Sequence, residues 1–134
     1  MKRVSFALLV YLLVQQLSFS APGPVIISEF MAFNTVSNAN TVLDDFRQLS
    51  DWIELRNTSN GPVNLENWAL TDDPNHDAVW RFPATNLNAG AFMIVFASGR
   101  NRAIPGAVLH TDFRLNGDGD YLALLESKFE AQDK

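Results

Sequence analysis

Short runs of alternating apolar and polar residues, separated by turn-forming residues, recur along most of this chain. In residues 51–57, Ile53 and Leu55 fall on one side of an extended strand, and Trp52 falls on the other side with two charged residues. This period of two predicts a strand with one face buried against a core. The Asn-Gly-Pro sequence at residues 60–62 then predicts a turn, because Gly accepts positive φ and Pro cannot donate to a strand ladder.

The same pattern predicts several more strands and no long helix. Residues 91–97 are apolar throughout, so we expect this strand to be buried on both faces, at the centre of the core. Residues 33–50 are rich in Asn, Asp, Ser and Thr and predict a long loop, with room for one helical turn over residues 43–49. The other expected strands are residues 25–32, 63–65, 68–70, 78–82, 108–115 and 121–125.

About six to eight short strands of this kind predict an all-β sandwich. The expected structural core consists of large apolar side chains from these runs: Leu55, Trp68, Trp80, Phe82, Phe92, Ile94 and Phe96. The chain has 134 residues, which is enough for one domain of ordinary size.

The N-terminus predicts export. Lys2 and Arg3 precede an apolar run over residues 4–17, and the small residues Ser18 and Ser20 follow it, as in a secretory signal peptide. We expect a signal-peptide helix over residues 1–20 that is cleaved after Ser20, with retention as an uncleaved anchor as the alternative. The run is short for a span of about 30 Å at 1.5 Å per residue.

Charge and cysteine content narrow the class of partner. Removal of residues 1–20 takes away two of the ten basic residues and no acid, so 8 Lys and Arg remain against 15 Asp and Glu, a net charge of −7. We therefore expect no nucleic-acid partner and, after cleavage, no membrane partner, since phosphate binding needs clustered cations. The absence of cysteine excludes disulfides and thiolate zinc sites.

The densest group of oxygen ligands lies in the polar turn after residue 71. Asp72, Asp73 and Asp77 are candidate ligands for calcium, which takes six to eight oxygens. The spacing does not match an EF-hand, and a solvated turn is the simpler interpretation. Residues 116–120, Asn-Gly-Asp-Gly-Asp, likewise first indicate a hairpin turn.

Candidate catalytic groups are sparse. His110 and Asp112 would point to the same face of a strand, but no nucleophile motif accompanies them, so a local structural role is the simpler interpretation. Glu29, Asp51 and Glu54 would need to face one another across a cleft to hydrolyse a glycoside, and short sandwich strands offer no obvious cleft. We therefore expect no enzyme and no cofactor, with calcium at the turn as the alternative to the solvated turn.

The three tryptophans raise the question of a binding platform. Trp52 shares a strand face with charged residues, which predicts partial exposure, so it is the candidate aromatic binding residue for sugar stacking. Trp68 and Trp80 have apolar neighbours and are expected in the core.

Several motifs together resemble the lamin-tail domain family in its bacterial, secreted form. They are D-W-I-E-L-R-N at residues 51–57, N-W-A-L-T-D-D at 67–73, W-R-F-P at 80–83, N-A-G and F-M-I-V-F-A-S-G within 87–99, and L-H-T-D-F at 109–113. The similarity covers residues 24–126. It implies an immunoglobulin-like β-sandwich over residues 21–126 without catalytic residues, which serves as an interaction or attachment module.

The resemblance also raises expectations about the whole protein. Members of the family usually continue with one more strand, whereas residues 127–134 form a polar tail here. This tail is interpreted as a truncated final strand or a linker into a longer, multidomain exported protein. We expect the partner to be a protein or a cell-envelope polymer and the protein to reside outside the cell or in the envelope. The alternative is a carbohydrate- or calcium-binding adhesin domain.

Overall fold

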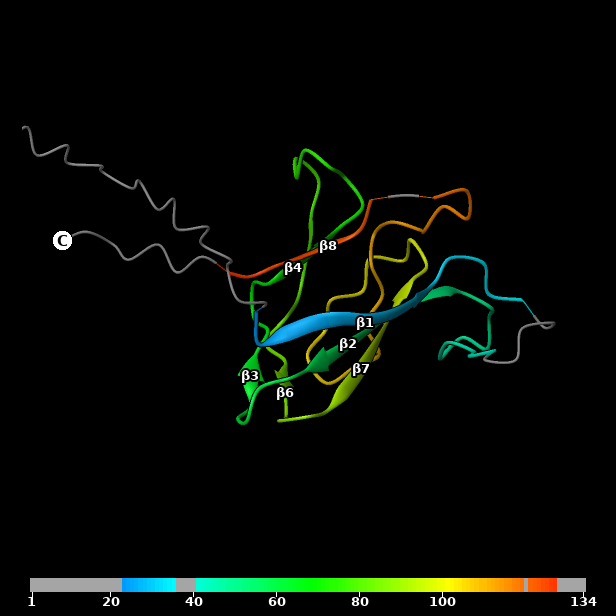
Figure 1. Ribbon diagram of the computed structural model, residues 1–134. Coiled ribbons are helices and arrows are strands. Elements are labelled where there is room, and N and C mark those ends of the chain that lie inside the picture. Colours follow the sequence, from blue (N-terminus) through cyan, green and yellow to red (C-terminus); the bar gives the residue numbers. More distant parts are fainter. Residues whose placement is uncertain (1–22, 36–40, 120, 128–134) are drawn as a thin grey trace, which may run out of the picture.

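The computed structural model describes residues 23–35, 41–119 and 121–127. The expected signal peptide and all but the first residue of the polar tail lie outside this part of the chain. The described part contains eight strands and no helix (Figure 1). They are β1 Val25–Met31, β2 Asp51–Asn57, β3 Val63–Asn64, β4 Ala69–Thr71, β5 Trp80–Arg81, β6 Asn86–Leu87, β7 Phe92–Ala97 and β8 Ala123–Leu125.

The larger sheet has the strand order β1-β2-β7, and both pairs are antiparallel. The central strand β2 is the one that the alternating pattern predicted, with the same bounds. Ile53 pairs with Val95 of β7 and Leu55 pairs with Met93, so these side chains share one face of the sheet. A bulge shifts the β1 register between Ile27 and Glu29.

The second layer consists of a β5-β4-β8 sheet and a separate β3-β6 ribbon. The buried apolar side chains from both layers form one core; they include Ile53, Leu55, Leu65, Trp68, Leu70, Trp80, Phe82, Leu87 and Val95. Asn57 at the end of β2 is fully buried, and its Nδ2 donates to the carbonyl oxygens of Gly61 and Leu87, both at 2.8 Å. This amide ties the larger sheet to the ribbon. The predicted all-β, immunoglobulin-like sandwich is confirmed.

The prediction for residues 91–97 was right about the strand and wrong about its burial. β7 lies at the edge of the sheet rather than at its centre. Phe92 is 56% exposed and Ile94 is only half-buried, because both belong to the face of β7 that points away from the core. Phe96 lies on the same outer face but is buried, for a reason that the site below explains.

The outer edge of β7 is partly covered by the segment that follows it. The Phe96 N–H donates to the Leu109 carbonyl at 2.9 Å, and the Thr111 N–H donates to the Phe96 carbonyl at 2.8 Å. Residues 108–115, predicted as a strand, therefore contribute isolated bridges at His110 and Arg114. The short strand β6 was not predicted, and residues 45–46 form a turn rather than a helical turn.

No helix in the described residues has the length and apolar character needed to cross a membrane.

Candidate functional site

The long loop between β1 and β2 is ordered around one carboxylate, that of Asp44. Its Oδ1 accepts the backbone N–H groups of Phe46 at 2.9 Å and Gln48 at 2.8 Å, and its Oδ2 accepts the Ser50 hydroxyl at 2.7 Å. Two further backbone bonds close the turn, from Asp44 N–H to Gln48 O and from Arg47 N–H to Asp44 O. The sequence is rich in residues that favour such side chain-to-backbone bonds, which explains a compact loop without a helix.

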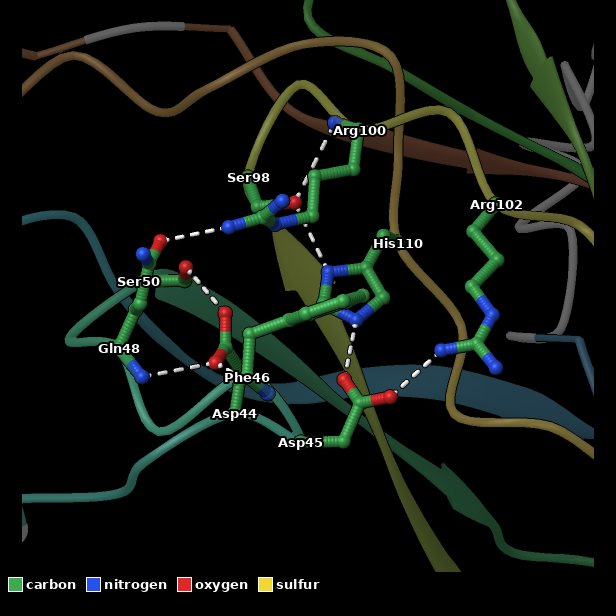
Figure 2. A network of polar contacts seen from close by, with 9 residues as sticks. All are labelled: Asp44, Asp45, Phe46, Gln48, Ser50, Ser98, Arg100, Arg102 and His110. Carbon is green, nitrogen blue, oxygen red and sulfur yellow. Dashed lines mark hydrogen bonds and ion pairs between the residues drawn. The ribbon is translucent and has the colours of Figure 1, made fainter.

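The next residue, Asp45, attaches this loop to the far part of the chain (Figure 2). Its Oδ1 lies 2.7 Å from Nε2 of His110, and its Oδ2 forms an ion pair with Arg102. On the other side of the ring, His110 Nδ1 lies 2.8 Å from the hydroxyl of Ser98. His110 is fully buried, and its backbone pairs with that of Arg102 through two hydrogen bonds.

An aromatic stack accompanies these polar contacts. The His110 ring stacks on Phe96 at a centroid distance of 5.5 Å and meets the edge of Phe46 at 5.6 Å. The Arg100 guanidinium lies 4.1 Å from the centroid of the Phe46 ring and donates to Gln48 Oε1 at 2.6 Å. On the outer face of β7, Phe96 is thus buried where the His110 ring stacks on it and where residues 109 and 111 pair with its backbone.

The partners of Asp45 favour its ionised form. The hydrogen bond from His110, with smaller contributions from Arg102, holds the pKa of the Asp45 carboxyl below its ordinary value, while burial partly opposes the shift. Asp45 therefore carries a negative charge at neutral pH and compensates Arg102. The loop is held to β7 and its following segment by a charged contact as well as by packing.

Ser98, His110 and Asp45 are the residue types of a hydrolytic triad, within hydrogen-bond reach of one another. The sequence interpretation had placed Asp112 beside His110, but Asp112 is exposed and His110 contacts Asp45 instead. Ser98 is 6% exposed, and its hydroxyl oxygen also accepts the Arg100 N–H at 3.3 Å. Buried Ser98 and His110 and the solvent-exposed Asp45 thus link two loops. Asp45 and His110 are 65 residues apart in the sequence, so no local sequence pattern could predict their contact.

A polar groove of about 460 Å³ opens beside this network, which is within the usual size range of ligand sites. Its lining comes from the ends of β1, β2 and β7 and the loops beyond them; it consists of Phe33, Asn34, Gln48, Leu49, Ser50, Asp51, Ala97, Ser98, Gly99, Arg100 and Arg114. Burial raises the pKa of Asp51 from its ordinary value, although backbone N–H groups and the Arg114 charge oppose the shift. The groove therefore combines two arginines with one carboxyl that is costly to ionise.

The acidic turn predicted as a calcium site is organised by its own backbone. Asp73 accepts the N–H groups of Asn75 at 2.9 Å, Asp77 at 2.9 Å and Ala78 at 3.1 Å. These bonds, the one from Asn75 first, lower the pKa of Asp73. Within residues 23–35, 41–119 and 121–127, no group of three or more His, Cys, Asp or Glu side chains could hold a metal ion. Asp72 and Asp77 do not converge with Asp73 on such a site.

The prediction that Trp52 is partly exposed is wrong. Trp52 is 3% exposed and pairs with Phe96 across β2 and β7, on the face opposite Ile53. The alternation of residues 51–57 did not reveal that the face opposite Ile53 is also buried at Trp52. Trp68 and Trp80 lie in the main core, so none of the three tryptophans forms a surface platform.

The fold is an immunoglobulin-like β-sandwich, and the polar network of Asp45, Ser98 and His110 joins two of its loops beside β7. Residues 18–134 match the family model described as Lamin Tail Domain. The chain belongs to this family, which consists of non-catalytic immunoglobulin-like domains, and it carries an interaction module of this kind. A search of the curated proteins finds no match to the chain.

Proposed function

We propose that this chain is the non-enzymatic attachment module of an exported, multidomain protein, and that it binds a protein or a cell-envelope polymer. The observation that carries the proposal is the position of the loop over residues 41–50. Asp45 holds this loop beside β7 through His110 and Arg102, and Gln48, Leu49 and Ser50 of the loop line one side of an open polar groove. Loops at the end of a rigid sandwich are where such folds present their recognition surfaces. The N-terminal pattern at residues 1–20 supports export of the module.

A structural role for the Ser98–His110–Asp45 link supports the non-enzymatic part of the proposal. A nucleophilic serine must reach a substrate carbonyl, whereas this hydroxyl is buried and engaged by the His110 ring and the Arg100 N–H. We expect no ester hydrolysis by the purified chain beyond that of a Ser98→Ala variant. Covalent labelling of Ser98 by a fluorophosphonate probe would contradict this expectation.

Retention on envelope material tests the attachment role. The purified chain, fluorescently labelled at its C-terminus, is mixed with sedimented envelopes from the producing cells, and bound label is measured after washing. Prior digestion of the envelopes with a protease or with a mixture of glycosidases then separates a protein partner from a polysaccharide. The proposal predicts saturable retention that heat-unfolded chain does not show. Equal retention of folded and unfolded chain, or none of either, would overturn it.

The calcium-binding alternative is tested in the same preparation. A ligand that binds only the folded state raises the melting temperature. Because the Asp73 carboxylate is already engaged by three backbone N–H groups, we expect no calcium-dependent shift.

A further inference from the structure

We propose that Asn60 is a site of spontaneous chemical modification, at which the side-chain amide is converted to aspartate and isoaspartate. Two turns of the chain contain the Asn-Gly dipeptide in which this reaction is favoured, at residues 60–61 and 116–117. Glycine favours the reaction because it has no side chain to shield its backbone nitrogen from the preceding asparagine. The structure distinguishes the two turns, and it places the first beside a buried amide that supports the sandwich.

The reaction needs only water in addition to the chain. The Gly61 nitrogen loses its proton to solvent base and attacks Cγ of Asn60, so that a new N–C bond forms and the amide nitrogen leaves as ammonia. Water then opens the cyclic succinimide. Cleavage of the bond between the ring nitrogen and Cγ gives aspartate. Cleavage of the bond between that nitrogen and the main-chain carbonyl carbon gives isoaspartate, in which the backbone runs through Cγ.

The Asn60 amide and the Gly61 nitrogen are both accessible for this reaction. Asn60 is exposed, and neither its side chain nor the Gly61 N–H takes part in a hydrogen bond within the described part of the chain. A Cβ placed on Gly61 would meet no atom within 4 Å, so the space around this residue is open. The amide can therefore rotate toward the backbone nitrogen without breaking a contact.

In the second turn the asparagine is also exposed, but its amide is already engaged. Asn116 Oδ1 accepts the Asp118 N–H at 3.1 Å, and its main-chain carbonyl accepts the Gly119 N–H at 3.4 Å. The Asn116 amide must give up its bond before it can move. The neighbouring Asp118 carboxylate also disfavours, by charge repulsion, the removal of a proton from the Gly117 nitrogen. Asn60 should therefore react first.

Isoaspartate at position 60 would disturb the buried amide of Asn57. The Gly61 carbonyl follows the modified bond and accepts Asn57 Nδ2 at 2.8 Å and the Ser59 hydroxyl at 3.0 Å. An extra backbone atom before Gly61 displaces this carbonyl and leaves Nδ2 of the fully buried Asn57 with the Leu87 carbonyl as its acceptor among the described residues. Aspartate leaves the backbone unchanged. Isoaspartate alone should therefore loosen the link between β2 and the β3-β6 ribbon.

Ageing of the purified full chain in mildly alkaline buffer tests the site. Peptide mapping by mass spectrometry follows the mass increase that accompanies replacement of an amide by a carboxylate, and isoaspartyl methyltransferase labels the isoaspartate. We expect the increase at residue 60 to be at least about tenfold faster than at residue 116, a difference of about 1.4 kcal/mol in the activation barrier. Gly61→Ala should slow the reaction at Asn60 by a similar factor, because the added methyl group crowds the attacking nitrogen.

Gly117→Ala is the matched control. Neither glycine has a positive φ, and the nearest atom to a Cβ on Gly117 is the Ala32 carbonyl oxygen at 3.7 Å. Both variants should therefore fold, which circular dichroism melts check, and Gly117→Ala should leave the reaction at Asn60 unchanged. The site is overturned if residue 60 keeps its mass, if Gly61→Ala ages as fast as the parent chain, or if residue 116 reacts as fast.

Amide hydrogen exchange tests the structural consequence. The Asn57 N–H donates to the Ala91 carbonyl and the Gly90 N–H donates to the Asn57 carbonyl, both at 3.0 Å, so these two amides report on the surroundings of Asn57. They should exchange faster in aged chain that contains isoaspartate than in Asn60→Asp, which carries the added charge without the extra backbone atom. Equal exchange in the two samples would overturn the predicted loosening.

Discussion

Two acidic loops of this protein look alike in sequence and behave differently in the structure. The loop over residues 41–50 is built on Asp44, and the turn over residues 72–78 is built on Asp73. In each case one carboxylate accepts neighbouring backbone N–H groups and so replaces the hydrogen bonds of regular secondary structure. Local composition explains both turns equally well.

The loops differ in what the other side chains reach. In the first loop, Asp45 contacts His110 and Arg102, and Gln48 accepts from Arg100, so the loop is fastened to a segment more than fifty residues away. In the second, His76 Nε2 lies 2.7 Å from the Tyr121 hydroxyl, and this contact is exposed to solvent. The comparison shows that a carboxylate can fix the local conformation of a loop by accepting its backbone N–H groups. A contact to a buried side chain from a distant segment is needed to fix the position of the loop against the sandwich.

Removal of the His110 ring should have the largest effect. His110→Ala leaves Ser98 and Asp45 without their shared partner and opens a cavity beside Phe96. We expect the free energy of unfolding to fall by about 2–4 kcal/mol in urea titrations. A fall in the free energy of unfolding of less than about 0.5 kcal/mol would mean that the contacts of His110 stabilise the first loop no more than the exposed contact of His76 stabilises the second.

Asp44→Ala should have the next largest effect. Asp44 is buried, and its removal deprives Phe46 and Gln48 N–H and the Ser50 hydroxyl of their acceptor. We expect a loss of about 1–3 kcal/mol, measured by the same titrations. Asp73→Ala should cost less, because the second turn exposes its backbone to water, which can replace the lost acceptor. Equal losses would contradict the distinction between the loops.

Acid should destabilise both loops by protonating their carboxylates. In the first loop, protonation of Asp45 should also weaken the contact with the distant His110. The folded-state pKa of Asp45 lies below its ordinary value of 3.8, so its stabilisation is present above that value and is lost as pH falls through the folded pKa. The same sign holds for Asp73. Asp45→Asn should therefore flatten the fall in melting temperature below about pH 5. An unchanged slope would show that the His110 contact does not stabilise the charged form.

Loss of the His76 ring should have the smallest effect. His76→Ala removes an exposed hydrogen bond to Tyr121 and no buried contact, so we expect a change within about 0.5 kcal/mol. Chemical shifts should change at residues of the second turn and near Tyr121 only. A loss comparable to that of His110→Ala would contradict the view that the second turn is only locally supported.

The sequence predicted the structure well where local conformation depends on residues that are adjacent in the chain. Residues 51–57 became β2 with the bounds that the alternation predicted, and the turn at residues 60–62 separates it from β3. β6 was missed because Asn86 and Leu87 sit among turn-forming residues and pair for two residues only. Two paired residues leave too short a pattern to recognise.

The sequence was a poor guide where structure depends on distant segments. The outer face of β2 and β7 carries Trp52 and Phe96, and both are buried there, with the distant His110 ring stacked on Phe96. The apolar run at β7 indicated a central strand, yet the strand order leaves Phe92 exposed at an edge. The candidate groove assembles side chains from residues 33–114, so no spacing within one motif could reveal it.

The 65-residue interval between Asp45 and His110 also sets an order of events when the chain is made. The ribosome delivers residues from the N-terminus, at about 5–20 per second. The segment that contains Asp45 therefore emerges several seconds before its histidine exists. Until then its carboxylate and the Phe46 ring have no partner at position 110, and a nascent chain halted before residue 110 would present an unfastened loop to proteases and chaperones.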